Sequence, residues 1–220
     1  MHETDTFPPA EEFFPRRITL KSLAAACQGC KACPLYLHAT QAVFGEGIPA
    51  ATLMLVGEQP GDQEDLAGKP FVGPAGRVLD EALAAARIDR TKVYVTNAVK
   101  HFKWEPRGKR RLHAKPSTTE IMACRPWLLE EIRLLAPRVI VCMGATAAQS
   151  LLGKTFRLTQ HRGEFQAAEI AGVNAQVLAT VHPSSILRIP DQEARHAARR
   201  DFTADFSLAA QRLAATRRAS

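Results

Sequence analysis

Short apolar runs alternate with longer amphipathic segments through the middle of this 220-residue chain. Four of the runs are rich in β-branched and other apolar residues and lack polar alternation, which predicts buried parallel strands. Between them, apolar residues recur at helical spacing, as in residues 74–86, which begin with a proline, and from residue 117, where a Ser-Thr-Thr-Glu capping box opens the segment. The predicted strands span residues 52–56, 93–97, 138–143 and 176–181.

The alternation of strands and helices predicts an α/β protein with three layers, α/β/α, around a mostly parallel four-stranded central sheet. Residues 163–181 are expected to contain a hairpin, and no internal repeat or low-complexity linker divides the chain. We therefore expect a single domain over residues 18–214. It would be flanked by a loosely ordered N-terminal arm, residues 1–17, and by a frayed tail, residues 215–220.

The composition is that of an ordinary soluble protein, with 46% hydrophobic and 23% charged residues. No apolar run approaches the roughly 20 residues that span a bilayer, and the first residues lack the pattern of a secretion signal. We therefore expect a cytoplasmic protein without a membrane partner. No long apolar surface run stands out, which favours a monomer, and the formal net charge of +7 favours an anionic partner such as a nucleic acid.

Glycine and proline are concentrated in the segment that follows the first predicted strand, from Gly57 to Gly76. The segment also carries the acids Glu58 and Asp62 and one aromatic residue, Phe71. Open α/β sheets bind ligands just beyond the carboxyl ends of their strands, so this segment is a candidate binding site. An ordinary strand-to-helix turn is the alternative.

Two other predicted strands end in polar side chains, Asn97 and His182. Singly, Asn97 is more typical of a turn and His182 of a hydrogen-bonded structural histidine. Together they would line one crevice with Glu58 and Phe71. Nucleotide binding loses its main support, because Gln63 stands where a Walker-type loop needs its first glycine and no Gly-x-Gly-x-x-Gly fingerprint follows the first strand.

The chain has five cysteines, of which Cys27, Cys30 and Cys33 form a C-x2-C-x2-C run, while Cys124 and Cys142 lie far along the sequence. A cytosolic chain is not expected to form disulfides. Zinc and a four-iron cluster both accept four thiolates, and the spacing leaves both open. Alternatively, Cys124 and Cys142 are small buried hydrophobic side chains.

From about Cys30 to about Phe206, these motifs resemble those of the iron–sulfur uracil-DNA glycosylases in identity, order and spacing. The matching segments are Gly57-Glu58-Gln59-Pro60-Gly61, Lys69-Pro70-Phe71-Val72-Gly73, Asn97 and His182-Pro183-Ser184-Ser185-Ile186-Leu187-Arg188. The resemblance implies uracil-containing DNA, single- or double-stranded, as the substrate. It also implies a 4Fe-4S cluster held by Cys30, Cys33, Cys124 and Cys142, with Cys27 spare.

Within that superfamily, the chain looks most like the X-type members, which become covalently attached to the DNA on which they act. Ordinary iron–sulfur members usually have Ala or Gly where Gln59 stands, and they lack an insertion like Lys109-Arg110-Arg111-Leu112-His113. Taken alone, this run is typical of a solvated or phosphate-contacting loop. The resemblance makes His113 the candidate nucleophile, which would attack the anomeric carbon of the sugar and stay bonded to it.

The resemblance also implies a role for each residue of the crevice. Phe71 would stack on the flipped uracil, Asn97 would pair with its edge, and His182 would donate a hydrogen bond to its O2. Glu58 would stabilise positive charge on the sugar. The remaining candidates are Gly57, Gln59 and Asp62 in the uracil pocket, the latter two as supports of the basic loop through Arg110 or Arg111, and Lys109, Arg110, Arg111, Ser184, Ser185 and Arg188 as contacts to DNA.

Three other functions stay open at this point. In the first, the protein is a turnover uracil-DNA glycosylase that uses water as the nucleophile, and His113 only contacts DNA. In the second, it is a non-catalytic iron–sulfur protein that binds nucleic acid. In the third, it is a zinc-bearing α/β binding domain.

Overall fold

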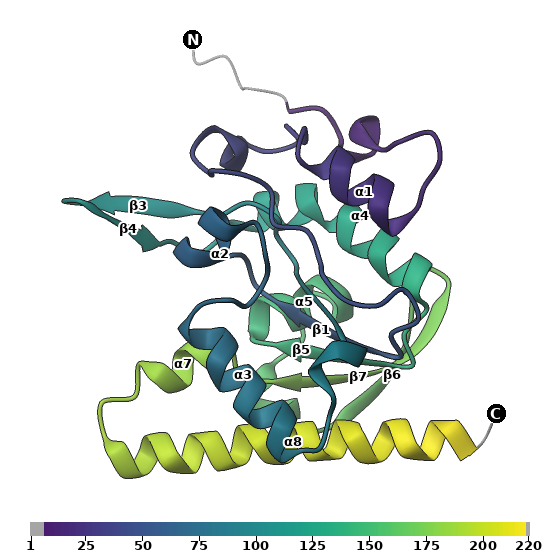
Figure 1. Ribbon diagram of the computed structural model, residues 1–220, viewed down its shortest axis with the longest axis vertical. Coiled ribbons are helices and arrows are strands. Elements are labelled where there is room, and N and C mark those ends of the chain that lie inside the picture. The colour runs from purple at the N-terminus through teal and green to yellow at the C-terminus, as the bar shows by residue number, and fades with distance from the viewer. Residues whose placement is uncertain (1–6, 219–220) are drawn as a thin grey trace.

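The computed structural model describes residues 7–218, and a five-stranded mixed sheet lies at its centre (Figure 1). The strand order is β2-β1-β5-β7-β6, in which the first four strands run parallel and β6 pairs antiparallel with β7. The mostly parallel sheet is confirmed, but it has five strands instead of the predicted four. The strands are β1 (Leu53–Gly57), β2 (Tyr94–Asn97), β5 (Val139–Met143), β6 (Phe165–Ile170) and β7 (Val173–Thr180).

The extra strand comes from the hairpin expected within residues 163–181. Ala171 and Gly172 both have positive φ angles, 52° and 76°, and they form a tight two-residue turn between β6 and β7. The turn folds β6 back against β7, so that the first arm of the hairpin joins the edge of the sheet.

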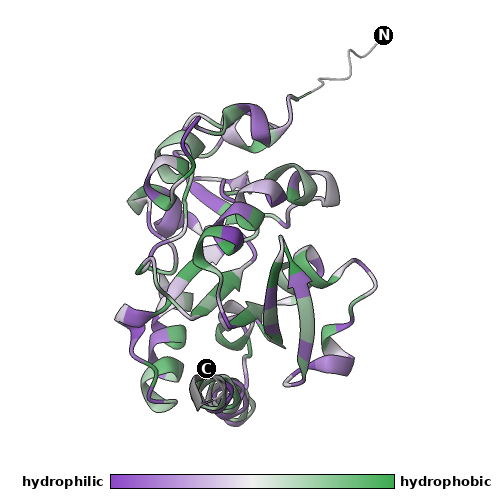
Figure 2. Cartoon of the chain, turned by 90° about the vertical axis from the view of Figure 1, so that its right-hand side faces the viewer, coloured by the Kyte–Doolittle hydropathy of each residue, from purple (hydrophilic) through white to green (hydrophobic). Residues whose placement is uncertain are grey.

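Helices cover both faces of the sheet, which confirms the three-layer α/β/α fold (Figure 1). On one face pack α3 (Pro74–Ala85), α7 (Pro183–Leu187) and the long α8 (Gln192–Arg218). On the other face pack α4 (Thr118–Leu135) and α5 (Ala145–Leu152). Figure 2, in which α8 is viewed nearly end-on, shows mainly hydrophobic strands in the middle of the molecule and many hydrophilic residues on the helices around them.

The sequence signals that predicted two of these helices take part in their ends. Ser117 accepts a hydrogen bond from the backbone N–H of Glu120, and the Glu120 carboxylate accepts one from the backbone N–H of Ser117, so the predicted capping box opens α4. Pro74 occupies the first turn of α3, where no backbone donor is needed.

A third cluster of buried side chains lies beside α4, where the N-terminal segment packs. It includes α1 (Leu20–Cys27) and the short 3-10 helices η1 (Ala10–Phe13) and η2 (Pro34–Leu37). Part of the expected N-terminal arm therefore has defined contacts: the Phe14 ring packs edge-on against Trp127, with 4.6 Å between centroids. Residues 1–6 of the arm and 219–220 of the tail lie outside the described residues, and the domain limits stay a prediction.

A two-stranded hairpin extends away from the central sheet (Figure 1). Its strands are β3 (Trp104–Arg107) and β4 (Arg110–His113), which pair antiparallel so that Trp104 faces His113 in the register. The remaining elements are α2 (Asp62–Ala67), η3 (Arg90–Lys92) and α6 (Leu158–His161). None of the helices within residues 7–218 is both long and apolar enough to cross a membrane.

Candidate active site

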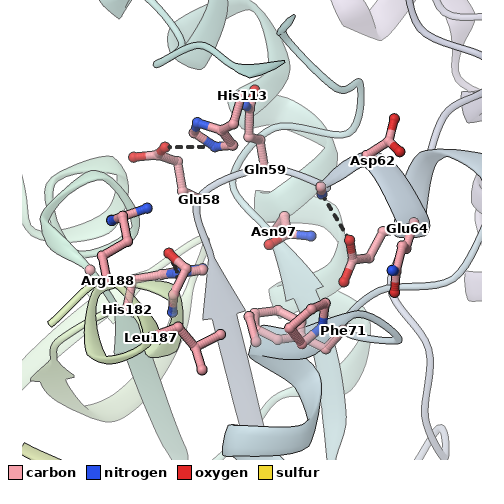
Figure 3. Close-up of a pocket in the computed structure, with 16 residues that line it drawn as sticks. Glu58, Gln59, Asp62, Glu64, Phe71, Asn97, His113, His182, Leu187 and Arg188 are labelled. Atoms are coloured by element: carbon pink, nitrogen blue, oxygen red, sulfur yellow. Dashed lines mark hydrogen bonds and ion pairs between the residues drawn. The ribbon is translucent and has the colours of Figure 1, made fainter. Parts of the chain in front are cut away.

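The carboxyl ends of the four parallel strands meet around one cavity of about 510 Å³, within the usual range for small-ligand pockets (Figure 3). Glu58 directly follows β1, Asn97 ends β2 and pairs in register with Gly57, and His182 lies two residues beyond β7. The parallel topology thus brings residues that lie far apart in the sequence to one cavity. Nine of the predicted residues line the cavity: Glu58, Gln59, Asp62, Phe71, Asn97, His113, His182, Ser184 and Arg188.

Gly57 leaves room for two of these side chains. A Cβ atom at this position would lie 2.2 Å from Oδ1 of Asn97 and 2.7 Å from Cζ of Phe71, distances too short for real contacts. Any larger residue would therefore push Asn97 or Phe71 out of place. Gly57 contributes to the pocket by the absence of a side chain.

Phe71 is held in an unusual backbone conformation. Its φ angle is 56°, in the left-handed region that aromatic residues rarely adopt. The helix α3 starts close behind it, and a Cβ on Gly76 would lie only 1.8 Å from the Phe71 carbonyl oxygen. Strained residues of this kind persist where the surrounding structure fixes them, often at functional sites.

Asn97 presents an unused hydrogen-bond acceptor. The residue is only 2% exposed, and its Oδ1 atom has no hydrogen-bond partner among residues 7–218. A buried acceptor without a partner is costly in a folded protein. The cavity that Asn97 lines is therefore suited to a ligand with an N–H donor.

A buried ion pair fixes the chain segment that carries Asn97. The ammonium group of Lys100 lies 2.5 Å from Oε2 of Glu131, and both side chains are fully buried. The same ammonium group donates a hydrogen bond of 2.8 Å to the backbone carbonyl of Asn97. Sequence reasoning missed this pair, because nothing in the separate surroundings of Lys100 and Glu131 indicates that they meet.

Ser184 contacts Nδ1 of His182 through its hydroxyl, at 2.8 Å, and through its backbone N–H, and the second contact assigns the tautomer. The Nδ1 atom of His182 accepts a hydrogen bond of 3.2 Å from the backbone N–H of Ser184, as the N-cap of α7. Nε2 is therefore the nitrogen that carries the proton. Burial, together with the nearby His113 and Arg188, lowers the pKa of His182 to about 4, so the ring is neutral at pH 7 and donates through Nε2.

His113 ends β4 and meets Glu58 at the cavity. Its Nε2 atom lies 3.5 Å from Oε1 of Glu58, and its side chain is 47% exposed. In the view of Figure 3, this pair lies at one end of the cavity and Phe71 at the other. Burial lowers the pKa of His113, Glu58 opposes the shift, and Arg188 adds to it. The imidazole is thus neutral near pH 7 and keeps a free electron pair.

Arg111 fastens the hairpin to α2. Its Nε atom lies 2.6 Å from Oδ1 of Asp62, and a terminal nitrogen lies 2.6 Å from Oδ2 of the buried Asp65. The guanidinium also stacks near Trp104, 5.6 Å from the ring centroid. The expectation that Asp62 holds the basic loop agrees with this contact. Nε and one terminal nitrogen of Arg111 are engaged within the protein, and its contact with DNA stays a prediction.

Gln59 joins both ends of the hairpin. Its Nε2 atom donates to the carbonyl oxygens of Lys103, at 3.1 Å, and Ala114, at 3.0 Å. Its Oε1 atom accepts from the backbone N–H of Lys103 at 3.0 Å, and the N–H of Ala114 donates to the Lys103 carbonyl at 3.0 Å. We expected Gln59 to bond Arg110 or Arg111, but it supports the loop through backbone groups. Neither Ala nor Gly at this position could make these bonds.

The other predicted DNA contacts lie at the rim of the site or beyond it. Lys109 and Arg110 are exposed near the turn of the hairpin and do not line the cavity. Ser184 and Arg188 line the cavity, whereas the Ser185 hydroxyl donates to the backbone carbonyl of His182.

Three of the four predicted metal ligands come together. Cys30, Cys33 and Cys124 are buried in the cluster beside α4, and the predicted spare residue Cys27 lies there as well. The backbone N–H of Lys100 donates to the Cys124 sulfur at 3.2 Å, and the indole N–H of Trp127 donates to the Cys30 sulfur at 3.3 Å. Burial raises the pKa of Cys33 to about 11 and that of Cys124 to about 12.

Cys142 does not join them, which corrects the predicted ligand set. It lies in β5, in the middle of the sheet, between Val56 and Ala179, and it packs in the separate core cluster under α4 and α5. Burial alone raises its pKa to about 12. Alternate residues of a strand face opposite sides of a sheet, and Cys142 faces the hydrophobic core, as the alternative of a small buried hydrophobic residue expected.

The donor set beside α4 fits an iron–sulfur cluster. Within residues 7–218, no three His, Cys, Asp or Glu side chains are placed to hold one metal ion. A 4Fe-4S cluster takes its thiolates on separate irons, so its ligands surround a larger group. Buried thiols with N–H donors aimed at the sulfurs suit such a group. Sequence reasoning missed one further candidate ligand, His101. It is buried and directly follows Lys100, whose backbone N–H donates to the Cys124 sulfur.

Comparison with known proteins matches residues 44–207 to the uracil DNA glycosylase superfamily. Three relatives named type-4 uracil-DNA glycosylase are similar along most of their length. The protein of Pyrobaculum aerophilum is 36% identical over 193 residues, which cover 86% of this chain and 92% of the relative. That of Thermotoga maritima is 37% identical over 183 residues, covering 83% and 90%. That of Archaeoglobus fulgidus is 32% identical over 192 residues, covering 86% and 90%.

Proposed function

This chain belongs to the uracil DNA glycosylase superfamily, and from that premise we propose that it excises uracil from DNA and is then captured on the DNA through His113. The observation that carries the proposal is the pair formed by the neutral imidazole of His113 and the Glu58 carboxylate, which lie 3.5 Å apart at one end of the cavity. A nucleophile and a carboxylate at this place suit chemistry on a sugar whose base is held inside the cavity.

Uracil recognition rests on Asn97 and His182. The unpartnered Oδ1 of Asn97 accepts the N3–H of uracil, and the amide nitrogen donates to O4. Cytosine has an acceptor at N3 and a donor at position 4, so both contacts would be lost. The proton on Nε2 of His182 donates to uracil O2, and Phe71 stacks on the base after the nucleotide has left the helix.

Cleavage separates charge between the sugar and the base. The bond from C1′ of the sugar to N1 of uracil breaks, its electron pair stays on the uracil, and positive charge develops on the sugar. The hydrogen bond from His182 stabilises the departing anion, and the Glu58 carboxylate stabilises the sugar. Hydrogen bonds to charged groups are worth about 1.5–3 kcal/mol each, so these residues act on both partners of the bond that breaks.

Capture then forms a bond from an imidazole nitrogen of His113 to C1′. The ring nitrogen that bonds C1′ uses its free electron pair, and the other ring nitrogen then loses its proton. The Glu58 carboxylate, 3.5 Å from Nε2, is a proton acceptor beside the ring, and the uracil anion gains one proton. Overall, one C–N bond replaces another and a proton moves from the imidazole to the base. An imidazole linked through nitrogen is a poor leaving group at neutral pH, so the protein stays attached to the DNA after one event.

The substrate also needs contacts outside the cavity. Lys109, Arg110 and Arg188 are exposed basic residues near the site and would bind phosphates, an interaction that weakens as salt rises. Ser184 and Ser185 would support the strand where the base is flipped out. We expect the protein to act as a monomer.

A denaturing protein gel tests the reaction directly. Uracil-containing single-stranded DNA is incubated with the protein, and the adduct is expected as a band of reduced mobility that survives denaturation. Abasic DNA in excess over protein, without that band, would instead identify a turnover glycosylase that uses water. Absence of released uracil under single-turnover conditions would indicate a protein that only binds nucleic acid.

His113→Ser is the most informative substitution. The adduct is expected to disappear while uracil release continues, because the pocket residues remain and water can reach the sugar. An unchanged adduct would contradict the role of His113. Arg107→Ser, on the same hairpin but outside the cavity, is the matched control and should still form the adduct.

We further propose that Cys30, Cys33 and Cys124 hold a 4Fe-4S cluster and that Cys142 takes no part. The family resemblance, the shared burial of the three thiols and the N–H donors to their sulfurs support this assignment. When bound, the cluster supplies a structural link between the N-terminal segment and α4. No proposed reacting side chain is a cluster ligand.

Cys124→Ser and Cys142→Ser form a matched pair for this proposal. The wild-type protein and Cys142→Ser are expected to be brown, with broad visible absorption and bound iron, whereas Cys124→Ser should lose both. Colourless wild-type protein that binds zinc would contradict the cluster. Cys27→Ser and His101→Ala, measured in the same way, identify the fourth ligand.

A further inference from the structure

Thr146 contacts the carboxylate of Glu58, although it lies outside all the motifs described above. Its hydroxyl donates a short hydrogen bond to Oε2 of Glu58, while Oε1 of the same carboxylate faces His113. Thr146 is 4% exposed, whereas the Glu58 side chain is 21% exposed. The two oxygens of Glu58 therefore have different surroundings, one fixed inside the protein and one facing the reacting groups.

The fold explains why a threonine at this position reaches Glu58. Strand β5 pairs directly with β1, and α5 begins immediately after β5, so the first turn of α5 lies beside the residue that follows β1. In the interior of a helix, a threonine hydroxyl can bond the carbonyl four residues earlier. Thr146 lies in the first turn, where that residue still belongs to the strand, and its hydroxyl bonds the carboxylate instead.

We propose that Thr146 is a positioning residue that orients Glu58 for catalysis, an inference that rests on the proposed function. A glutamate side chain has three rotatable bonds, and a partly exposed carboxylate would otherwise adopt several orientations. The bond to Oε2 holds the group in one of them and leaves Oε1 directed at His113 and the sugar. Threonine suits this task because its β-branched side chain has few rotamers.

The consequence concerns the rate of bond cleavage and not the affinity for DNA. Thr146 does not line the cavity, so it is not expected to contact the base. A misoriented Glu58 would stabilise the sugar charge less well and would be a poorer proton acceptor for His113. Loss of one hydrogen bond to a charged group corresponds to a change in rate of about 10- to 100-fold.

Thr146→Val and Thr146→Ser separate the hydroxyl from the shape of the side chain. Valine keeps the size and branching of threonine without the hydroxyl, and serine keeps the hydroxyl. Single-turnover uracil release is expected to fall about 10- to 100-fold in Thr146→Val and to return to within about threefold of wild type in Thr146→Ser. The affinity for uracil-containing DNA and the melting temperature, measured in parallel, should change little.

A double-mutant cycle tests whether Thr146 acts through Glu58. In a Glu58→Gln background, Thr146→Val is expected to change the rate by less than about twofold, because the group that it orients is already impaired. Wild-type rates in Thr146→Val, equal losses in the serine and valine variants, or an undiminished effect in the Glu58→Gln background would each overturn the inference. Wild-type protein that releases no uracil would instead overturn the proposed function.

Discussion

The residues that would bind the base and the hairpin that carries His113 are held at the same cavity by different kinds of contact. The pocket residues Asn97 and His182 sit at the ends of buried strands, so the sheet itself fixes their positions. The hairpin that carries His113 is largely exposed and is held through the side chains of Arg111 and Gln59. In the proposed reaction, the residues at the strand ends recognise and release the base. The hairpin determines whether His113 or water reacts with the sugar.

This contrast predicts that variants of the two regions fail in different ways. Changes in the pocket should lower uracil release and adduct formation together, because both need the flipped base. Changes in the hairpin should lower adduct formation while leaving uracil release. The ratio of adduct to free abasic DNA, measured on one gel, is the quantity that separates the two.

Asn97→Ala should have the largest effect. Loss of the amide removes the recognition of N3–H and O4, and removal of one such polar contact in an active site costs about 100- to 1,000-fold in rate. Release and adduct should fall in parallel, as quantified by single-turnover kinetics. Asn174→Ala, in the hairpin turn region of β7 far along the strand from the site, serves as a control. A variant that kept releasing uracil while losing the adduct would break the division between the regions.

As the pH falls, His113 on the hairpin should become protonated before His182 does. Only the neutral imidazole of His113 is a nucleophile, and its lowered pKa means that this form persists below the usual value of 6.5 for histidine. Adduct formation should therefore stay level from pH 8 to near 6.5 and, below the pKa of His113, fall by about tenfold per pH unit. His182, with a pKa of about 4, remains neutral over that range.

The uracil release of His113→Ser, followed over the same pH range, provides the reference for this measurement. Its ratio to the wild-type adduct rate isolates the titration of His113 from that of all other groups. A ratio that does not change with pH would show that the protonation of His113 is irrelevant to capture.

Arg111→Ala should reduce adduct formation by about tenfold with little change in uracil release, because it leaves the buried Asp65 without its ion-pair partner and loosens the hairpin. Arg111→Lys should restore only part of the activity, since lysine cannot bond Asp62 and Asp65 with a planar fork. Arg107→Ala, at an exposed position of β3 in the same hairpin, should be close to wild type. Equal effects of both alanine variants would point to lost charge instead of lost positioning.

Gln59→Ala should have the smallest effect, a decrease of about threefold to fivefold in the fraction of DNA captured, because other contacts still hold the hairpin. Gln59→Glu is a useful companion, since it keeps the size of the side chain but loses the amide donor to the carbonyls of Lys103 and Ala114. The fraction captured is read from the same gel. No change in either variant would assign the support of the hairpin to Arg111 alone.

The parts of the site that follow strands could be predicted from the sequence, because a parallel sheet brings all its carboxyl ends to one edge. Thr146 lies at the same edge, just after β5, but a threonine in an ordinary helix start carries no signal of its own. Its importance depends on β5 pairing with β1, which spacing does not reveal. The same holds for Lys100 and Glu131, which meet only in the folded chain.

The errors in the prediction have a similar physical origin. The family resemblance assigned Cys142 to the cluster, but its position in β5 turns it toward the core under α4 and α5. Strand β6 was left out of the sheet count because it is only partly buried, as befits an edge strand, and lacks the apolar run of the inner four. Local patterns identify elements, whereas the neighbours of a side chain depend on how those elements pair.

The backbone closure at the base of the hairpin has a consequence for engineering. Lys103 and Ala114 are already joined by a hydrogen bond of 3.0 Å, so the ten residues between them leave and re-enter the body at adjacent points. We therefore expect that this segment can be removed or transferred as one cassette. Replacement by a two-residue turn should leave the sheet intact, and the same cassette, grafted with its glutamine onto a related scaffold, would carry the capacity for self-capture with it.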